Sequence, residues 1–253
     1  MSLIRLEGIS RVYGSGPAAV HALRPTHLTF EEGMLVAIFG VSGSGKSTLL
    51  NMLGLLDEPT SGDYLLEGRN VAKLTDATRS VIRCKQIGII FQSFNLFPHF
   101  SILENVCMPM RFAGVERHEM KARASELLNR VGLGDRLSHS PSQLSGGQCQ
   151  RVAIARALAN SPSVILADEP VASLDPITTV QVMDDFARIN KDFGITIVAN
   201  MHHVDLAIKY ATRIIGIQDG RVVYDGPSRQ IDDKTLVQIY GRSLKHDEVL
   251  GES

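Results

Sequence analysis

A glycine-rich loop that follows an apolar run most constrains what this chain can fold into. The run MLVAIF ends at Phe39, and the helix-forming stretch LLNMLGLL comes after the loop. A strand, a loop and a helix in this order are the context that the phosphate-binding pattern G-x-x-x-x-G-K-[ST] requires. The loop consists of Gly40, Val41, Ser42, Gly43, Ser44, Gly45, Lys46, Ser47 and Thr48. We therefore predict that it binds a polyphosphate.

The residue types in the loop suit this chemistry. Glycines let the backbone turn its N–H groups inward, and the start of the helix adds a partial positive charge. Lys46 would reach the β and γ oxygens, and the Ser47 hydroxyl could ligate Mg²⁺. Kinases, GTPases and motors share such loops, so the activity must be inferred from other residues.

Five short apolar runs, rich in β-branched residues, alternate with helical stretches along the chain. Runs that are apolar throughout indicate strands covered on both faces of a mostly parallel sheet. They are Met34–Phe39, Ile87–Phe91, Ser163–Ala167, Ile195–Ala199 and Arg213–Ile217. We expect an α/β fold with a P-loop NTPase core.

The sequence pattern changes twice outside this core. Stretches such as KARASELLNRVGL predict a helical subdomain inserted over residues 93–161, whereas the first thirty residues alternate like a small antiparallel β subdomain. The nucleotide-binding core would then comprise residues 1–92 and 162–230, and one amphipathic helix would occupy residues 231–253. All four segments would form a single nucleotide-binding domain.

Two adjacent carboxylates follow the buried run that ends at Ala167. Asp168 would lie at the carboxyl end of a core strand beside the glycine-rich loop, where it could hold Mg²⁺. Glu169 could orient or deprotonate the attacking water, and Pro170 would end the strand. This pair predicts hydrolysis.

A third motif, LSGGQ, runs directly into the helical stretch CQRVAIARALA. Ser145 is a good N-cap, and paired glycines expose the N–H groups of a helix start, which makes a second phosphate-binding end. The residues that would line it are Ser145, Gly146, Gly147 and Gln148. This motif resembles the signature of ABC ATPases. The resemblance implies a head-to-tail dimer in which each ATP lies between the loop of one copy and the signature of the other.

The resemblance also implies roles for four further residues. Tyr13 is similar to the aromatic that stacks on adenine, and Gln92 to the glutamine that contacts Mg²⁺ and the lytic water. Asp175 resembles an aspartate that communicates across the dimer, and His202 a histidine that bonds the γ-phosphate. Each has a simpler alternative. Tyr13 could be a core tyrosine, Gln92 a solvated glutamine and Asp175 a helix cap before a proline. The switch role of His202 could be taken instead by the neighbouring His203.

One short cassette with these motifs in order is similar to transporter ATPases rather than to DNA-repair or translation relatives. The resemblance implies Mg²⁺-dependent ATP hydrolysis, transmembrane permease subunits as partners and a substrate-binding protein that acts through the permease. The block NMHHVDLAIKYATRIIGIQDGRVVYDG resembles phosphonate-importer ATPases, and LNMLGLLDEPTSGDYLLEG resembles lipoprotein-release and macrolide-efflux ATPases. We expect import of phosphonate or a related anion, with efflux or lipoprotein release, or a hybrid sequence, as alternatives.

Composition limits the other classes of function. The 26 basic and 27 acidic side chains nearly cancel, which argues against a nucleic-acid partner. No apolar run reaches the roughly 18 residues of a membrane span, and the first ten residues lack a leader pattern, so we expect a peripheral protein on the cytoplasmic face of the inner membrane. The three cysteines are expected to be free thiols.

Two rival activities remain at this point. A P-loop phosphotransferase would need an acceptor pocket and an arginine-bearing lid, and it would not need the signature helix. A regulatory cassette would bind ATP only as dimer glue, and it would not need Asp168, Glu169 and His202.

Overall fold

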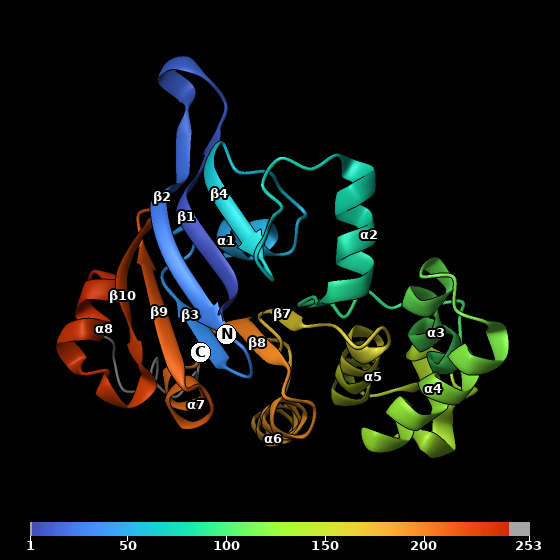
Figure 1. Ribbon diagram of the computed structural model, residues 1–253. Coiled ribbons are helices and arrows are strands. Elements are labelled where there is room, and N and C mark those ends of the chain that lie inside the picture. Colours follow the sequence, from blue (N-terminus) through green and yellow to red (C-terminus); the bar gives the residue numbers. More distant parts are fainter. Residues whose placement is uncertain (1, 243–253) are drawn as a thin grey trace.

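The computed structural model describes residues 2–242, and its centre is a six-stranded sheet (Figure 1). The strand order is β10-β9-β3-β8-β7-β6, and every neighbouring pair is parallel except β10 with β9. The strands are β3 (Leu35–Phe39), β6 (Ile87–Ile90), β7 (Val164–Asp168), β8 (Thr196–Asn200), β9 (Arg213–Gln218) and β10 (Arg221–Pro227). The mostly parallel α/β core predicted from the five apolar runs is therefore confirmed.

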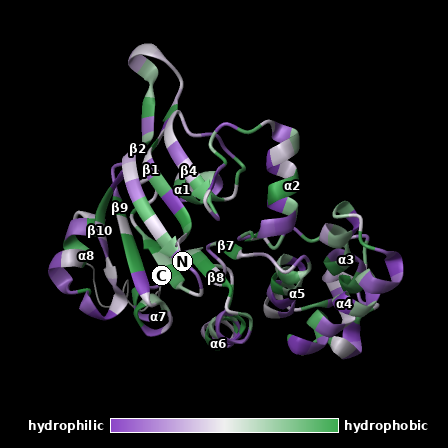
Figure 2. Cartoon of the chain, in the orientation of Figure 1, coloured by the Kyte–Doolittle hydropathy of each residue, from purple (hydrophilic) through white to green (hydrophobic). Residues whose placement is uncertain are grey.

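Strand β3 shows why those runs are apolar throughout. All five of its residues are buried, and they divide by parity between two hydrophobic clusters. Leu35, Ala37 and Phe39 belong to the cluster that includes the helical region, whereas Val36 and Ile38 belong to the one beneath the antiparallel sheet. Figure 2 shows the central strands as apolar segments inside a polar exterior. A sheet buried on both faces needs apolar side chains at every position.

A second, antiparallel sheet has the order β2-β1-β4-β5. Its strands are β1 (Ser2–Tyr13), β2 (Val20–Glu31), β4 (Ser61–Leu66) and β5 (Arg69–Asn70). The first thirty residues form the two long strands, as expected, but β4 and β5 come from a later segment that the sequence analysis did not assign. In β4 only Tyr64 and Leu66 are buried, so its apolar signal is short.

Three helices and two 3₁₀ turns fill the stretch between residues 93 and 161. They are α3 (Ile102–Phe112), α4 (Arg117–Arg130), η2 (Gly134–Arg136), η3 (Pro141–Gln143) and α5 (Gly146–Leu158). Helix α5 packs closely on β6, since a Cβ at Gly88 would lie 2.7 Å from the Ala157 carbonyl oxygen. Helix α2 (Asp76–Gln86), which precedes β6, was not expected; it buries only Arg79 and Ile82.

The remaining helices flank the core. They are α1 (Lys46–Leu53), α6 (Pro176–Phe193), α7 (Val204–Tyr210) and α8 (Asp233–Tyr240), with 3₁₀ turns η1 (Gly16–Ala18) and η4 (Ser228–Gln230). The single helix expected over residues 231–253 is shorter in the structure: α8 begins at Asp233 and ends at Tyr240, where Gly241 forms a left-handed C-cap, and residues 243–253 lie outside the described part. Cys84, Cys107 and Cys149 are free thiols. Within residues 2–242 no helix has the length and apolar character of a membrane span.

Candidate functional site

The glycine-rich loop lies between β3 and α1, at the carboxyl end of the sheet. Gly40 and Gly45 have φ of +153° and +110°, conformations that L side chains rarely adopt. A Cβ at Gly40 would lie 2.2 Å from the Ile217 carbonyl oxygen, and one at Gly45 would lie 2.4 Å from that of Ala22. Both glycines are therefore required by close backbone approach as well as by conformation.

This geometry predicts unequal effects of two alanine substitutions in the loop. Gly43 also has a positive φ, of +77°, but a Cβ there would meet no atom within 4 Å. Gly45→Ala should lower the free energy of unfolding by about 1–3 kcal/mol more than Gly43→Ala, because only the former must displace backbone. Urea unfolding of the two nucleotide-free variants measures this difference. Equal losses would contradict the close approach of β2 to Gly45.

Lys46 is folded back onto its own loop. Its Nζ donates to the Gly40 carbonyl at 2.8 Å and to the Val41 carbonyl at 3.0 Å, and the residue is buried. Burial lowers the pKa of Lys46, while the charges of Glu169 and Asp168 act in the opposite direction. A cation held here, close to both carboxylates, is placed where phosphate oxygens would enter the loop.

The loop opens into a cavity of about 590 Å³. Beside loop residues, it is lined by Val20, His21, Ala22 and Arg24 of β2 and by Asp219 and Gly220 of the β9–β10 turn. The Gly220 N–H donates to the Ser44 carbonyl at 2.9 Å, so this turn braces the loop. Sequence reasoning missed these wall residues, because nothing local in β2 or in the turn indicates that they meet the loop.

Both predicted carboxylates lie at the carboxyl end of β7, as expected. Asp168 Oδ1 accepts a hydrogen bond from Asn200 Nδ2 at 2.6 Å. Glu169 has a left-handed backbone, with φ of +48°, and its Oε1 accepts from His202 Nε2 at 2.6 Å. The structure thus joins Glu169 to His202, 33 residues further along the chain, and His202 rather than His203 makes the contact.

The predicted magnesium ligands are oxygen donors. Ser47, in the first turn of α1, and Gln92, just after β6, are exposed, and Asp168 is half-buried. The described residues hold no group of three or more His, Cys, Asp or Glu side chains that could bind a metal. A hydroxyl, a carboxylate and an amide oxygen fit Mg²⁺, which is usually held by one or two protein ligands together with phosphate oxygens and waters. The side chains of Ser44 and Asn200 also leave buried oxygen atoms without a protein partner among residues 2–242.

The signature residues form the predicted helix start. Ser145 is the N-cap of α5, its Oγ accepts from the Gln148 N–H at 3.3 Å, and Gln148 Oε1 accepts from the Ser145 N–H at 3.0 Å. A Cβ at Gly147 would lie 2.2 Å from Thr178 Cγ2, so α5 closely approaches the start of α6. Gly146 has more space, its nearest neighbour being Leu174 at 3.4 Å.

This helix start lies apart from the glycine-rich loop. Helix α5 packs on β6, and β6 is three strands from β3, which carries the loop. At the usual strand spacing the two strands are about 14 Å apart. Figure 1 shows α1 and α5 over different parts of the sheet. A single chain therefore presents two separated helix starts, one after the glycine-rich loop and one at the signature motif.

The segment after Gln92 is tied to the signature helix by Arg156, which the sequence analysis did not single out. Its guanidinium donates to the carbonyls of Phe94 at 2.7 Å and Asn95 at 2.5 Å, and burial lowers its pKa. Both carbonyl residues have a left-handed backbone. Movement of the Gln92 segment would thus be transmitted to α5.

Asp175 occupies a place that fits its simpler alternative, a helix cap, whereas Tyr13 is exposed at the end of β1 and is therefore not a core tyrosine. Asp175 caps α6, accepts from the Thr178 N–H at 3.0 Å and has a pKa lowered by its hydrogen bonds to Thr178. The Tyr13 hydroxyl donates to Asp57 at 2.5 Å, and the guanidinium of Arg11 lies 4.5 Å from its ring centroid. Tyr13 does not line the 590 Å³ cavity.

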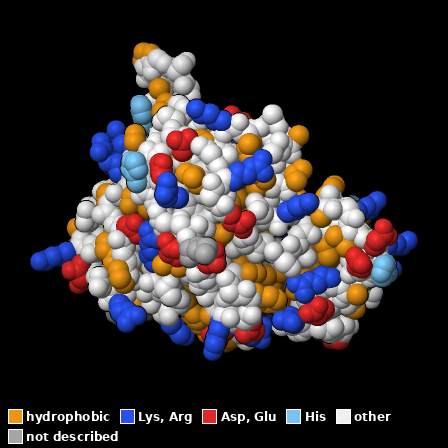
Figure 3. All heavy atoms as spheres, in the orientation of Figure 1, with side chains coloured by type: hydrophobic (Ala, Val, Ile, Leu, Met, Phe, Trp, Pro, Cys, Tyr) orange, Lys and Arg blue, Asp and Glu red, His pale blue; other side chains and the backbone are white. Residues whose placement is uncertain are grey.

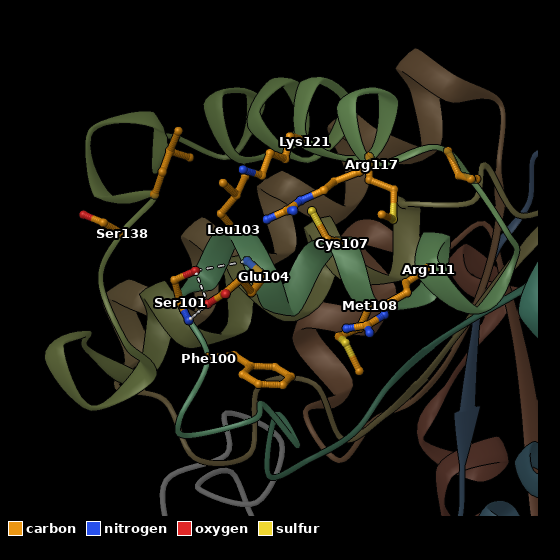
Figure 4. A pocket seen from close by; sticks show the side chains of 13 residues that line it. Phe100, Ser101, Leu103, Glu104, Cys107, Met108, Arg111, Arg117, Lys121 and Ser138 are labelled. Atoms are coloured by element: carbon orange, nitrogen blue, oxygen red, sulfur yellow. Dashed lines mark hydrogen bonds between the residues drawn. The ribbon is translucent and has the colours of Figure 1, made fainter.

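A larger cavity, of about 850 Å³, lies away from all of these residues, between α3 and α4 (Figure 4). Arg111, Arg117 and Lys121 line it together with Glu104 and Cys107, and burial raises the pKa of that thiol. On the face shown in Figure 3, basic and acidic side chains are interspersed. Size alone therefore does not identify the site; the chemistry of the glycine-rich loop does.

Known proteins resemble the chain over its whole length. Residues 23–172 match a family described as ABC transporter. The phosphonates import ATP-binding protein PhnC of Staphylococcus haemolyticus is 45% identical, with 99% of each chain covered, and that of Staphylococcus aureus strain MRSA252 is 44% identical with the same coverage.

Solved structures agree with this likeness. The ATP-binding cassette MJ0796, determined as a dimer in a post-hydrolysis state with ADP and Pi, is 40% identical with a TM-score of 0.81, and the match covers 90% of this chain and all of that one. The cbiO1 protein of Clostridium perfringens, part of the transporter complex cbiONQ, is 28% identical with a TM-score of 0.83, covering 94% and 93%.

Proposed function

The chain belongs to the ABC transporter family, and from that premise we propose that two copies form a Mg²⁺-dependent ATPase that drives phosphonate import. The observation that carries the proposal is the separation on one chain of two predicted phosphate-binding ends, the glycine-rich loop after β3 and the start of α5 against β6. Because these two ends lie apart on one chain, a single nucleotide can contact both kinds of end only if they come from different copies.

In the proposed arrangement each ATP lies between two copies placed head to tail. One copy contributes the loop amides, Lys46 and Ser47, and the other contributes the start of α5. Ser145 and Gly147 would act through this helix start, whose first N–H groups have no partner within the helix; the capping box engages those of Ser145 and Gln148. The structure of MJ0796, a 40% identical cassette determined as a dimer bound to ADP and Pi, supports the assembly of two copies.

Binding would rearrange two contacts of the isolated chain. Lys46 would exchange the Gly40 and Val41 carbonyls for phosphate oxygens, which are stronger acceptors for an ammonium group. Glu169, now paired with His202, would turn to the attacking water and accept its proton, while His202 would donate to the γ-phosphate. Ser47, Asp168 and Gln92 would hold Mg²⁺, which neutralises phosphate charge when bound.

Hydrolysis would be coupled to transport through the helical region. Arg156 links the Gln92 segment to α5, so displacement near the γ-phosphate would move α3–α5 together. Permease subunits that contact this region would then change conformation. The cassette would thus act as a peripheral protein on the cytoplasmic face of the membrane, and a substrate-binding protein would act through the permease.

Phosphonate is the proposed cargo because two relatives named for phosphonate import match 99% of the chain at 44–45% identity. Deleting the gene that encodes this chain from its native cells should abolish uptake of labelled methylphosphonate. Re-expressed wild type should restore uptake, and the Glu169→Gln variant should not. Normal phosphonate uptake in the deletion strain would contradict the cargo assignment, and increased macrolide sensitivity would support efflux instead.

A further inference from the structure

Asn200 is a buried polar residue that none of the predicted roles uses. It ends β8, has no exposed surface, and stands in parallel register with Asp168 on one side and Ile38 on the other. Ile38 lies two residues before Gly40. Asn200 therefore occupies the strand end between the acidic pair and the glycine-rich loop.

Its side chain is bonded to one acid and its backbone to the other. Nδ2 donates to Asp168 Oδ1 at 2.6 Å, and the Asn200 carbonyl accepts from the Glu169 N–H at 3.2 Å. The amide orientation follows from chemistry, because the opposite orientation would place two acceptor oxygens against each other. A hydrogen bond to a carboxylate is short and strong, so this contact fixes the direction in which the Asp168 carboxylate points.

The other end of the amide is unsatisfied by protein. Among residues 2–242, no donor lies within hydrogen-bond distance of Asn200 Oδ1, although the atom is buried. An unpaired buried amide oxygen is destabilising, so a structural role alone would favour an apolar side chain here. Ser44 Oγ in the loop is also buried without a hydrogen-bond partner among residues 2–242. It lies beside Gly40, two residues after Ile38, which is paired with Asn200.

We infer that Asn200 is a positioning residue for the cation site: its amide orients Asp168, and its Oδ1 accepts a hydrogen bond from water bound at that site. This inference deepens the proposed function, since it concerns the same Mg²⁺–nucleotide site. Contacts of this kind to a metal ligand typically contribute 10–100-fold to metal affinity.

The test is a Mg²⁺ titration of nucleotide affinity, followed with a fluorescent, non-hydrolysable ATP analogue. Asn200→Leu keeps a similar volume but removes the donor and the acceptor. Its affinity for the analogue in EDTA should stay within about twofold of wild type, because the phosphate contacts of the loop remain. The Mg²⁺ midpoint, which is the Mg²⁺ concentration that produces half of the increase in affinity for the analogue, should rise by about tenfold or more.

Asn190→Leu is the matched control. The Asn190 amide donates to the carbonyls of Gly33 and Ile195, at the opposite end of β8. It should lower thermal stability without changing the Mg²⁺ midpoint. If Asn200→Leu does not fold, Asn200→Ser replaces it, because a serine side chain is too short to span the distance to Asp168.

Three outcomes decide between the roles. The inference is supported if Asn200→Leu raises the Mg²⁺ midpoint in the wild-type background but causes no further rise in the Asp168→Asn background, where Asn200 has no carboxylate to orient. A folded Asn200 variant with the wild-type midpoint overturns it and leaves Asn200 structural. A wild-type protein whose nucleotide affinity does not respond to Mg²⁺ at all would contradict the proposed function itself, which separates the two failures.

Discussion

Glu169→Gln is expected to reduce steady-state ATP hydrolysis by about 10²–10⁴-fold, the usual contribution of a general base. The amide keeps the size of the side chain but cannot accept a proton from the attacking water. Nucleotide affinity should remain within a few-fold of wild type, because the hydrogen-bond partner of the Glu169 side chain is His202 and not a residue of the glycine-rich loop. Phosphate release and equilibrium binding, measured on the same preparation, separate the two effects.

Glu119→Gln, on the exposed first turn of α4, is the matched control and should leave turnover unchanged. Hydrolysis at the wild-type rate by Glu169→Gln would remove Glu169 as the base. The Glu169–His202 pair would then be a resting contact without a role in the chemical step.

Lys46→Ala should weaken nucleotide binding by roughly 10–100-fold, because a charged hydrogen-bonding group contributes about 1.5–3 kcal/mol. The loss should exceed that of a surface lysine, since Lys46 is buried and its Nζ is held within the loop by the Gly40 and Val41 carbonyls. Isothermal titration with ADP gives the affinity directly and avoids turnover.

Lys73→Ala serves as the control for the charge alone, because Lys73 is exposed between β5 and α2. Its affinity for ADP should match wild type. Unchanged affinity in Lys46→Ala would contradict the assignment of the glycine-rich loop as the phosphate site, whatever the behaviour of the other motifs.

Local signals in the sequence were sufficient for the core and for the loop. Strands β3, β7 and β8 are buried on both faces, so their composition alone indicates them. The loop is a contiguous motif whose conformation depends on its own glycines. By contrast, β4 and α2 have few buried residues, and their place depends on partners far along the chain.

Contacts between distant segments explain what the sequence could not predict within the site. Asn200 meets Asp168 only because β8 lies between β3 and β7, an order that no local pattern specifies. Arg156 meets Phe94 because α5 packs on β6. Adenine stacking by Tyr13 and communication by Asp175 stay predictions, since the first is engaged by Arg11 and Asp57 and the second caps α6.

The central claim is that a complete site requires two copies. The molar mass of the Glu169→Gln variant in the presence of ATP tests it most directly. Light scattering should give the 27.6 kDa of one chain without nucleotide and twice that mass with ATP and Mg²⁺. Adding Ser145→Arg should preserve ATP binding but return the mass to that of one chain, because the exposed cap residue would face the partner's nucleotide. A Glu169→Gln protein that binds ATP and keeps the mass of one chain would contradict the claim.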